Sequence, residues 1–271
     1  PNTVPGMIAR SMPAPSRFFG DELIWNDPAN PHNPMMDQKG RVWMTSAIRN
    51  RANPDYCRDG SDNAYAQYFP LDNGFRSAVY YDPEAEEFVM VDTCFGTHHL
   101  QFAEDESNTL YFSGGGQVIG WLDTAIWDET GDEVAAQGWC PTVLDTNGDG
   151  VITKPWNEPP RRGEPDSRDP QLDTRVVIGS YGVIGDPTDH KAVWISSNRF
   201  PGRLARLHVG NNPPETCVTE MYEVPSVLDP NVPKEKTGFG ARGIDIDRQG
   251  VIWTALSGSS HFASFDRSQC S

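Results

Sequence analysis

Residues 37–45 read DQKGRVWMT, a polar turn that leads into a β-branched residue, an aromatic residue and a residue with a hydroxyl group. Related phrases follow along the chain, as NTLYFS at 108–113, HKAVWIS at 190–196 and DRQGVIWTA at 247–255. The residues just before the last copy, 243–247, alternate apolar and polar side chains, which is typical of a half-buried strand that enters a tight turn. Each copy therefore predicts a β-hairpin.

Further strands are predicted next to these hairpins. A third strand is indicated at 202–208 and at 261–266, and a fourth at 88–92 and at 218–225. The unit is then a four-stranded antiparallel sheet that recurs every ~60 residues, longer than the ~40–50 residues of common propeller repeats because its loops are long. Such sheets, repeated around an axis, form the blades of a β-propeller, and each blade covers the faces of its neighbours.

We therefore expect an all-β fold, with a single β-propeller region over residues 1–271 made of about four to five four-stranded antiparallel blades. A loop near 140–173, rich in proline, is expected as an insertion. A closed ring usually needs more blades, and the ends of the chain resemble those of a processed piece. The region is thus expected to be an incomplete part of a larger propeller, completed by the same polypeptide or by another protein chain. An irregular β-sandwich is the alternative fold.

Composition excludes several classes of protein. The 25 Gly and 23 Pro among 271 residues argue against a helical bundle, and the best helix candidate, 128–138, is short. A formal charge of −16 repels phosphate backbones and anionic membranes, and no stretch approaches the ~20 apolar residues of a membrane helix. We expect no nucleic-acid partner and no membrane insertion. A cation, or a neutral or basic ligand such as a small molecule or a glycan, is the expected partner.

The five cysteines lie far apart and form no C-x-x-C pair, so disulfide bonds are a better explanation than a zinc site. Their positions in the repeat predict that Cys57 pairs with Cys94 and that Cys217 pairs with Cys270. Cys140 would then be free, or bonded outside this sequence. Disulfide bonds and the acidic, Trp-rich composition favour a secreted or periplasmic protein; a buried free thiol is the alternative for the odd cysteine.

A calcium loop is the sharpest local motif. Residues 145–150 read DTNGDG, in which Asp145, Asn147 and Asp149 offer side-chain oxygens at positions 1, 3 and 5. The glycine at position 6 allows the sharp turn, and Val151 offers its carbonyl oxygen at position 7. These residues predict a Ca²⁺ site.

The end of the loop departs from an EF-hand. Position 12, which holds a bidentate Glu in an EF-hand, is Trp156, and the nearest acidic residue is Glu158. Pro155 and Pro159 exclude a normal exiting helix. We therefore expect a calcium loop without helices, completed by Glu158, a later acidic residue or water, in which the ion staples the loop and does no chemistry. An Asx-rich turn without an ion is the alternative.

Histidines are the candidate catalytic residues. His98 and His99 are adjacent, and neighbouring residues of a strand point to opposite faces, so only one of them should face a site unless a bulge intervenes. His261 follows a Gly/Ser loop near the expected mouth of the central channel. Either His99 or His261 is a candidate general base, whereas a single inward histidine is more often a hydrogen-bonded core residue.

The phrases GRVWMT at 40–45 and GVIWTA at 250–255, each followed by a Gly-containing loop and a strand, resemble the blades of the streptogramin (virginiamycin B) lyase superfamily. The resemblance spans most of residues 33–267. A closer likeness, to long exported bacterial proteins called lyase-like or carboxypeptidase-regulatory-like, is carried by AQGWCP at 136–141, LDTNGDG at 144–150, NPPETC at 212–217 and SFDR at 264–267.

The lyase resemblance implies an elimination in which a histidine removes a proton next to an ester carbonyl and Mg²⁺ stabilises the enolate. His261 is the residue that corresponds to a lyase site position. The Trp-Phe-Thr-Glu phrase of the lyases reads WTAL at 253–256, so the metal-binding Glu has no counterpart there.

The sequence therefore leaves two candidate functions. The first is an exported propeller with a structural Ca²⁺ ion and a ligand-binding, partner-binding or scaffold role. The alternative is an enzyme, of lyase type with metal-assisted elimination or hydrolytic, that uses His261 or His99. Convergence of His99, His261 and acidic side chains at the propeller axis would favour the enzyme.

Overall fold

The chain folds mainly into short strands. The structure is a computed structural model that describes residues 31–47, 52–74, 76–114, 116–160, 165–224 and 230–270. In these residues, three sheets have four strands, one has three and one has two, and the pairings between named strands are antiparallel. The predicted all-β fold of four-stranded antiparallel sheets is confirmed.

Strands follow chain order within each larger sheet. The first sheet contains β1 (His32–Met36), β2 (Val42–Ser46), β3 (Ser77–Asp82) and β4 (Glu87–Val91). The second contains β5 (Leu100–Phe102), β6 (Leu110–Phe112), β7 (Val118–Leu122) and β8 (Gln137–Pro141). The third contains β11 (Ser180–Gly185), β12 (Ala192–Ser197), β13 (Arg203–His208) and β14 (Val218–Glu223). The fourth contains β15 (Ala241–Ile246), β16 (Val251–Leu256) and β17 (His261–Asp266), and the two-stranded sheet joins β9 (Val143–Leu144) to β10 (Thr174–Arg175).

Helices within the described ranges are short. They are α2 (Ala64–Tyr68), α3 (Thr124–Thr130), α4 (Glu133–Ala136) and the 3₁₀ turns η1 (Asp55–Cys57), η2 (Lys234–Lys236) and η3 (Arg267–Gln269). The helix candidate at 128–138 corresponds to the end of α3 and to α4. Asp123 caps the start of α3, and Gly131, with φ of 63°, ends it. No helix of the described residues is long and apolar enough to cross a membrane.

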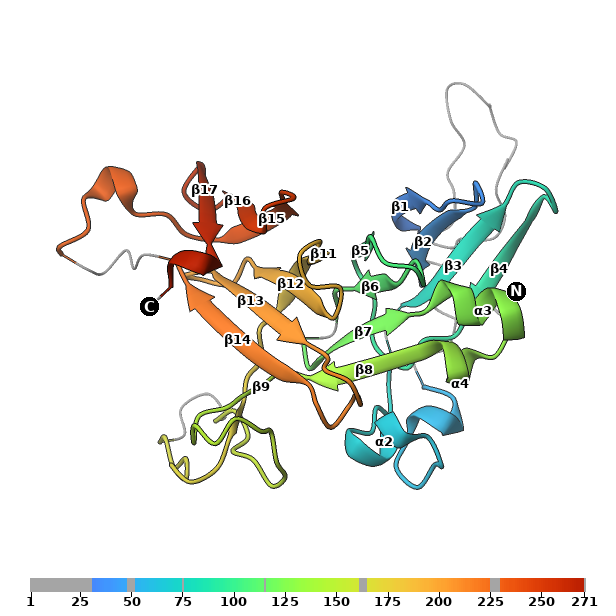
Figure 1. Ribbon diagram of the computed structural model, residues 1–271, viewed down its shortest axis with the longest axis horizontal. Helices are drawn as coiled ribbons and strands as arrows, with labels where there is room; N and C mark the ends of the chain where they lie inside the picture. The colour runs from blue at the N-terminus through green and yellow to red at the C-terminus, as the bar shows by residue number, and fades with distance from the viewer. Residues whose placement is uncertain are drawn as a thin grey trace, which may run out of the picture.

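The four larger sheets follow one another along an arc (Figure 1), with β1–β4 at one end and β15–β17 at the other. Their first strands are neighbours in the order β1, β5, β11 and β15. This is the arrangement of propeller blades, because the innermost strands of successive blades meet around one axis. A sandwich of two facing sheets would not place the first strands side by side.

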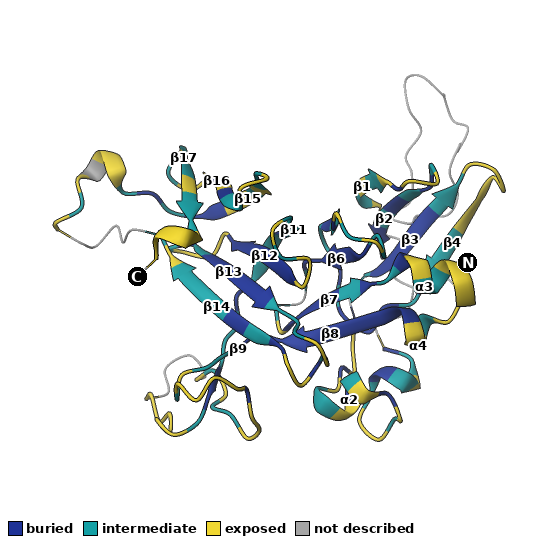
Figure 2. Cartoon of the chain, viewed as in Figure 1, coloured by how far each residue is buried: buried dark blue, intermediate teal, exposed yellow. Residues whose placement is uncertain are grey.

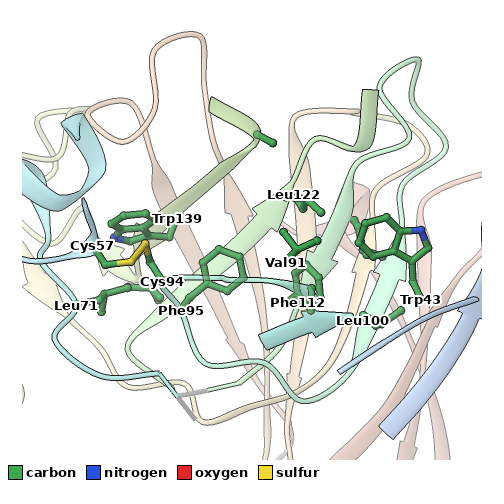
Figure 3. Close-up of a cluster of buried hydrophobic side chains, with 14 of the residues drawn as sticks. Trp43, Cys57, Leu71, Val91, Cys94, Phe95, Leu100, Phe112, Leu122 and Trp139 are labelled. Carbon is green, nitrogen blue, oxygen red and sulfur yellow. A yellow bond between two sulfur atoms is a disulfide. The ribbon is translucent and has the colours of Figure 1, made fainter. Parts of the chain in front are cut away.

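Each hydrophobic core lies between neighbouring sheets, as the blade arrangement requires. Figure 3 shows the core of the first two sheets, in which Trp43 of β2 and Trp139 of β8 are fully buried. Removing such an aromatic side chain typically costs ~3–5 kcal/mol of stability. Burial is deepest in the strands of the middle sheets and decreases at β15–β17 (Figure 2), where Trp253 is 39 % exposed and Phe262 is 70 % exposed.

The turn aspartates of the hairpin phrase have a structural role. One carboxylate oxygen accepts backbone N–H groups of the turn, as Asp37 does from Lys39 and Arg41, both at 2.9 Å. The other accepts the indole N–H of the strand that follows, over 2.8 Å from Trp43 to Asp37, 3.0 Å from Trp194 to Asp186 and 3.2 Å from Trp253 to Asp247. The phrase therefore combines a turn cap with a partner for the indole N–H.

The disulfide bonds agree with the prediction only in part. Cys57 is bonded to Cys94, as predicted, with their Cα atoms 5.3 Å apart. The predicted bond between Cys217 and Cys270 is wrong, because Cys217 is bonded to Cys140 and Cys270 is exposed and unpaired. The prediction failed because it did not take account of which strand lies beside Cys217. Cys217 lies just before β14, which packs against β9, and β9 follows shortly after β8, the strand that contains Cys140.

Candidate functional site

A cluster of polar side chains lies where the first strands of the four sheets begin. His32 starts β1, His98 and His99 directly precede β5, Tyr181 is in β11 and Arg242 is in β15. Because these first strands are neighbours, residues more than 200 positions apart in sequence reach one site. The cluster is called the axial site below.

The three histidine rings of the axial site contact one another, and the tyrosine ring contacts two of them. His32 and His98 stack with centroids 4.6 Å apart, and His99 stands edge-on to both, at 5.0 and 4.4 Å. Tyr181 lies 4.5 Å from His99 and 5.2 Å from His98. Arg242 covers the Tyr181 ring and donates to its hydroxyl oxygen over 2.7 Å. The site is therefore a packed group of rings with a cation at one side.

His98 and His99 both reach the axial site, which the sequence allowed only if a bulge interrupted the regular strand. The interruption is a bend at His98, before β5 begins. The backbone N–H of His98 donates to the Ser113 carbonyl over 2.6 Å, and the carbonyl of His99 accepts from the Ser113 N–H over 2.9 Å. Successive side chains at a bend need not alternate, so both rings reach the axial site.

Hydroxyl groups of the hairpin phrase hold the axial residues in place. In each of three sheets, the hydroxyl two residues after the phrase's aromatic residue donates to a backbone carbonyl of the next sheet. The bonds run from Thr45 to His98 over 3.0 Å, from Ser113 to Tyr181 over 2.5 Å and from Ser196 to Arg242 over 2.7 Å. These hydroxyl staples join consecutive sheets at the residues that form the site.

Burial and neighbouring basic groups lower the pKa of two of the histidines. Burial, followed by the charges of His98, His32 and Arg242, lowers the pKa of His99 to about 4. Burial also lowers the pKa of His98, followed by His32, Arg76 and Arg242. The groups that act on these two histidines are all basic. The axial site is thus a locally cationic place in a chain with a formal charge of −16.

Two ring nitrogens of the axial site, Nε2 of His32 and Nε2 of His99, are buried and have no hydrogen-bond partner among the residues that the structure describes. The other nitrogen of His99, Nδ1, lies 2.6 Å from Oδ1 of Asn33. Because an amide oxygen can only accept, the proton of the neutral ring belongs on Nδ1. The lone pair of His99 therefore lies on Nε2 and is free to receive a proton donor or a metal ion.

The second predicted catalytic residue lies elsewhere. His261 begins β17, the third strand of its sheet, and pairs with Leu256 of β16. Its Nδ1 is buried and has no hydrogen-bond partner within the described ranges. The group of histidines close enough to share an ion consists of His32, His98 and His99, so His261 is not brought together with His99 in that group.

Sequence reasoning missed three residues of the axial site, although a signal was present. Each stands five residues before the aspartate of its turn, with His32 before Asp37, Tyr181 before Asp186 and Arg242 before Asp247. His99 stands six residues before Asp105. Reading this offset of five or six residues across the four phrases would have pointed to the site.

The predicted calcium loop forms a tight turn closed by its own side chains. The carboxylate of Asp145 accepts from the N–H groups of Gly148 and Gly150, at 2.7 and 2.9 Å. Oδ1 of Asn147 accepts from Asp149 and Oδ1 of Asp149 accepts from Val151, both at 3.0 Å. Such bonds occur both in an ion-binding loop and in an Asx-rich turn. The Ca²⁺ ligands named from the sequence therefore stay a prediction.

Glu158, predicted as a further ligand, is engaged by its neighbours. Its Oε1 accepts from the Trp156 indole N–H over 2.8 Å, and its Oε2 accepts from Nε of Arg175 over 2.7 Å. Burial acts to raise the pKa of Glu158, but the hydrogen bonds from Arg175 and Trp156 lower it on balance. A hollow of about 400 Å³ lies beside the loop, lined in part by Thr146, Asn157 and Asp169.

No family model matches the chain, and no curated protein matches it. A Bacteroides uniformis protein named as a candidate 6-phosphogluconolactonase aligns at 11 % identity and a TM-score of 0.44, over 91 % of this chain and 53 % of that one. A streptogramin B lyase aligns at 12 % identity and a TM-score of 0.33, over 89 % of this chain and 66 % of that one.

The virginiamycin B lyase of Staphylococcus aureus aligns at 11 % identity and a TM-score of 0.26, over 89 % of this chain and 85 % of that one. The solved structures thus include the lyases that the hairpin phrases resemble, and these neighbours are β-propeller proteins. The chain spans about half the length of the lactonase-like structure. At these identities and TM-scores the likeness carries no inference about activity.

Proposed function

We propose that the chain is part of an exported, calcium-stabilised β-propeller that binds a small anionic molecule at the axial site. The observation that carries this proposal is the convergence of residues from four first strands on a site with the cation Arg242 and with His99, whose pKa of about 4 leaves its imidazole neutral at pH 7. When a ligand is bound, the charges that line the site act on it more strongly than the net charge of the whole chain does. A carboxylate or a phosphate is therefore the chemical group we assign to the ligand, in place of the cationic or neutral ligand expected from the net charge.

Anion binding is tested with inorganic phosphate and acetate as probes, by titration calorimetry on protein treated with a chelator. Wild-type protein should bind at least one of the two anions. Arg242→Met should weaken binding at least tenfold, and Arg248→Met should not, because Arg248 is exposed in the same hairpin and pairs with Glu104. Thermal midpoints establish that both variants fold. Absence of binding, or equal binding by all three proteins, would overturn the proposal.

Export and the structural ion are further parts of the proposal. The two disulfide bonds in the described residues are typical of an oxidising compartment, so we place the protein in the periplasm or outside the cell. We assign Ca²⁺ to the loop of Asp145, Asn147 and Asp149, with the Val151 carbonyl, because these oxygens are the ligands that Ca²⁺ prefers. Glu158 would join them only by leaving Arg175.

A further blade is the partner that we propose for the last sheet. Trp253 and Phe262 stack at 5.6 Å on a face of β16 and β17 that is open to solvent. Faces of propeller blades are covered by the next blade, from the same polypeptide or from another chain. In the complete protein, Phe262→Glu should then lower the thermal midpoint because it buries a charge. An unchanged midpoint would contradict a covering blade.

An elimination enzyme of lyase type is the second candidate function, favoured by the free lone pair on His99 Nε2. A pKa of about 4 makes His99 a weak base at neutral pH, which is why binding is proposed first. The test is ring opening of virginiamycin B in the presence of Mg²⁺. Activity that is lost in His99→Gln or in His261→Gln, but kept in His190→Gln, would support the enzyme, and inactive wild-type protein would exclude this substrate.

A further inference from the structure

We propose that His32, His98 and His99 hold a divalent transition-metal ion, with Zn²⁺ as the first candidate. This inference goes beyond anion binding and beyond the structural Ca²⁺ ion, because it adds a second, chemically different metal site at the axis. Three histidines leave a tetrahedral ion with one open position, which is the arrangement of a site that binds a ligand.

The convergence of the three rings is the first observation. Each ring offers one nitrogen, and these nitrogens all lie within 4.8 Å of one another. Zn–N bonds of ~2.0–2.1 Å place the ligand atoms of a tetrahedral site about 3.3 Å apart, so modest side-chain rotations complete the site. Within the described ranges, this is the one group of three or more His, Cys, Asp or Glu residues that meets the same distance criterion.

The unpartnered nitrogens are the second and independent observation. Nε2 of His32 and Nε2 of His99 are buried with no hydrogen-bond partner in the described residues. A buried polar atom without a partner is unfavourable, and a metal ion would satisfy both nitrogens at once. Coordination through Nε2 would therefore give each of these two rings the partner that it lacks in the described part of the chain.

The hydrogen bond from His99 to Asn33 is the third observation. A histidine that ligates a metal through one nitrogen usually donates its other N–H to an oxygen, which fixes the tautomer and the ring orientation. His99 does this through Nδ1 and Oδ1 of Asn33, at 2.6 Å. Asn33 belongs to the same strand as His32 and so links two of the proposed ligands.

The donor set decides which ion fits. Three imidazole nitrogens suit Zn²⁺ and related transition metals, whereas Mg²⁺ and Ca²⁺ prefer oxygen ligands. The Mg²⁺ ion implied by the lyase resemblance is thus a poor match for these histidines. A dication next to Arg242 would leave the site strongly positive, and an anion bound at the open position would offset that charge. The anion at the open position rests on the proposed anion binding, but the metal site does not.

Metal binding is tested without any assay of activity. The folded protein is freed of metal with a chelator and titrated with Co²⁺, whose visible absorption reports tetrahedral nitrogen ligands, and then with Zn²⁺ in competition. One equivalent of either ion should bind. His32→Gln and His99→Gln should each weaken binding at least tenfold, whereas His190→Gln, at an exposed position away from the cluster, should bind as wild type does.

A second variant keeps the test decisive if a histidine variant fails to fold. Asn33 has φ of +52°, so glycine removes its side chain without backbone strain. Asn33→Gly keeps all three histidines and should weaken Co²⁺ and Zn²⁺ binding ~10–100-fold. Failure of wild-type protein to bind one equivalent, or binding that none of these variants weakens, overturns the metal site. Phosphate binding by the metal-free protein reports on the anion proposal separately.

Discussion

Ser196 offers the sharpest test of the hydroxyl staples. Its side chain is fully buried, donates to the Arg242 carbonyl over 2.7 Å and accepts from the Gly182 N–H over 3.1 Å. Ser196→Ala keeps the size of the residue but leaves both backbone groups without this partner. A buried group deprived of its partner costs ~1–3 kcal/mol, and Arg242 is an exposed residue, so we expect a total loss of about 2 kcal/mol in the free energy of unfolding.

The assay is thermal or urea unfolding, followed by circular dichroism. For a chain of this size, about 2 kcal/mol corresponds to a decrease of ~4–8 °C in the midpoint. Ser197→Ala is the matched control, because Ser197 is the next residue of β12, is also buried and accepts only one long bond, at 3.4 Å from the Arg199 N–H. The control should change the midpoint by less than half as much.

The same variant should affect the axial site. The Ser196 hydroxyl holds Arg242 in place by donating to its backbone carbonyl, so Ser196→Ala should also weaken phosphate binding. Ser197→Ala should not. A Ser196→Ala protein with the stability of wild type and the same anion affinity would refute the reasoning that the staples position the site. Equal losses in both variants would show instead that the loss arises from general packing in β12.

Three further predictions follow from other parts of the structure. Asp149→Ala should lower the thermal midpoint in calcium and remove the effect of a chelator on it; a wild-type midpoint indifferent to the chelator, with no Ca²⁺ uptake in calorimetry, would leave only an Asx-rich turn. Burial acts to raise the pKa of Asp186, but hydrogen bonds from Thr188, Trp194 and Arg206 lower it below 3.8 on balance. The charged carboxylate therefore stabilises the fold above that pH, and this contribution is lost as pH falls further. Asp186→Asn should reduce the loss of stability at acid pH in unfolding experiments, and an unchanged loss would contradict the role of the charge. Without reduction, alkylation followed by peptide mapping should label Cys270 and leave Cys140 and Cys217 unlabelled, and labelling of Cys217 would contradict the observed pairing.

The hairpins could be predicted from sequence because their pattern is local. Trp43 follows its turn aspartate by six residues and Trp194 follows its own by eight, and each indole N–H donates to that aspartate within one hairpin. The turn at Asp145 is equally local, because the Asp145 carboxylate accepts from the Gly148 N–H three residues further on. The disulfide from Cys57 to Cys94 spans one sheet and its loops, so position in the repeat was sufficient to find it.

The axial site could be predicted only in part because it depends on contacts between sheets. His99 was found through its unusual doublet, but nothing near His32 or Arg242 in sequence says that β1, β5, β11 and β15 meet. The bond from Cys140 to Cys217 failed for the same reason, since the repeat places Cys217 at an outer edge without saying which neighbouring sheet it meets. The alternation of apolar and polar residues along the chain predicts strands. The position of one sheet against the next determines which residues form the site.

The fourth sheet shows how this placement is encoded and where it changes. Thr45, Ser113 and Ser196 each stand two residues after the aromatic residue of their phrase, and each hydroxyl reaches the next sheet. Ala255 occupies that position after Trp253, and the neighbouring hydroxyl, Thr254, donates within its own sheet to the Gly243 carbonyl over 2.8 Å. The series of staples therefore ends at the sheet whose aromatic face is open. A further blade on this sheet would have to be held by apolar contacts with Trp253 and Phe262, because Ala255 has no hydroxyl group with which to position its first strand.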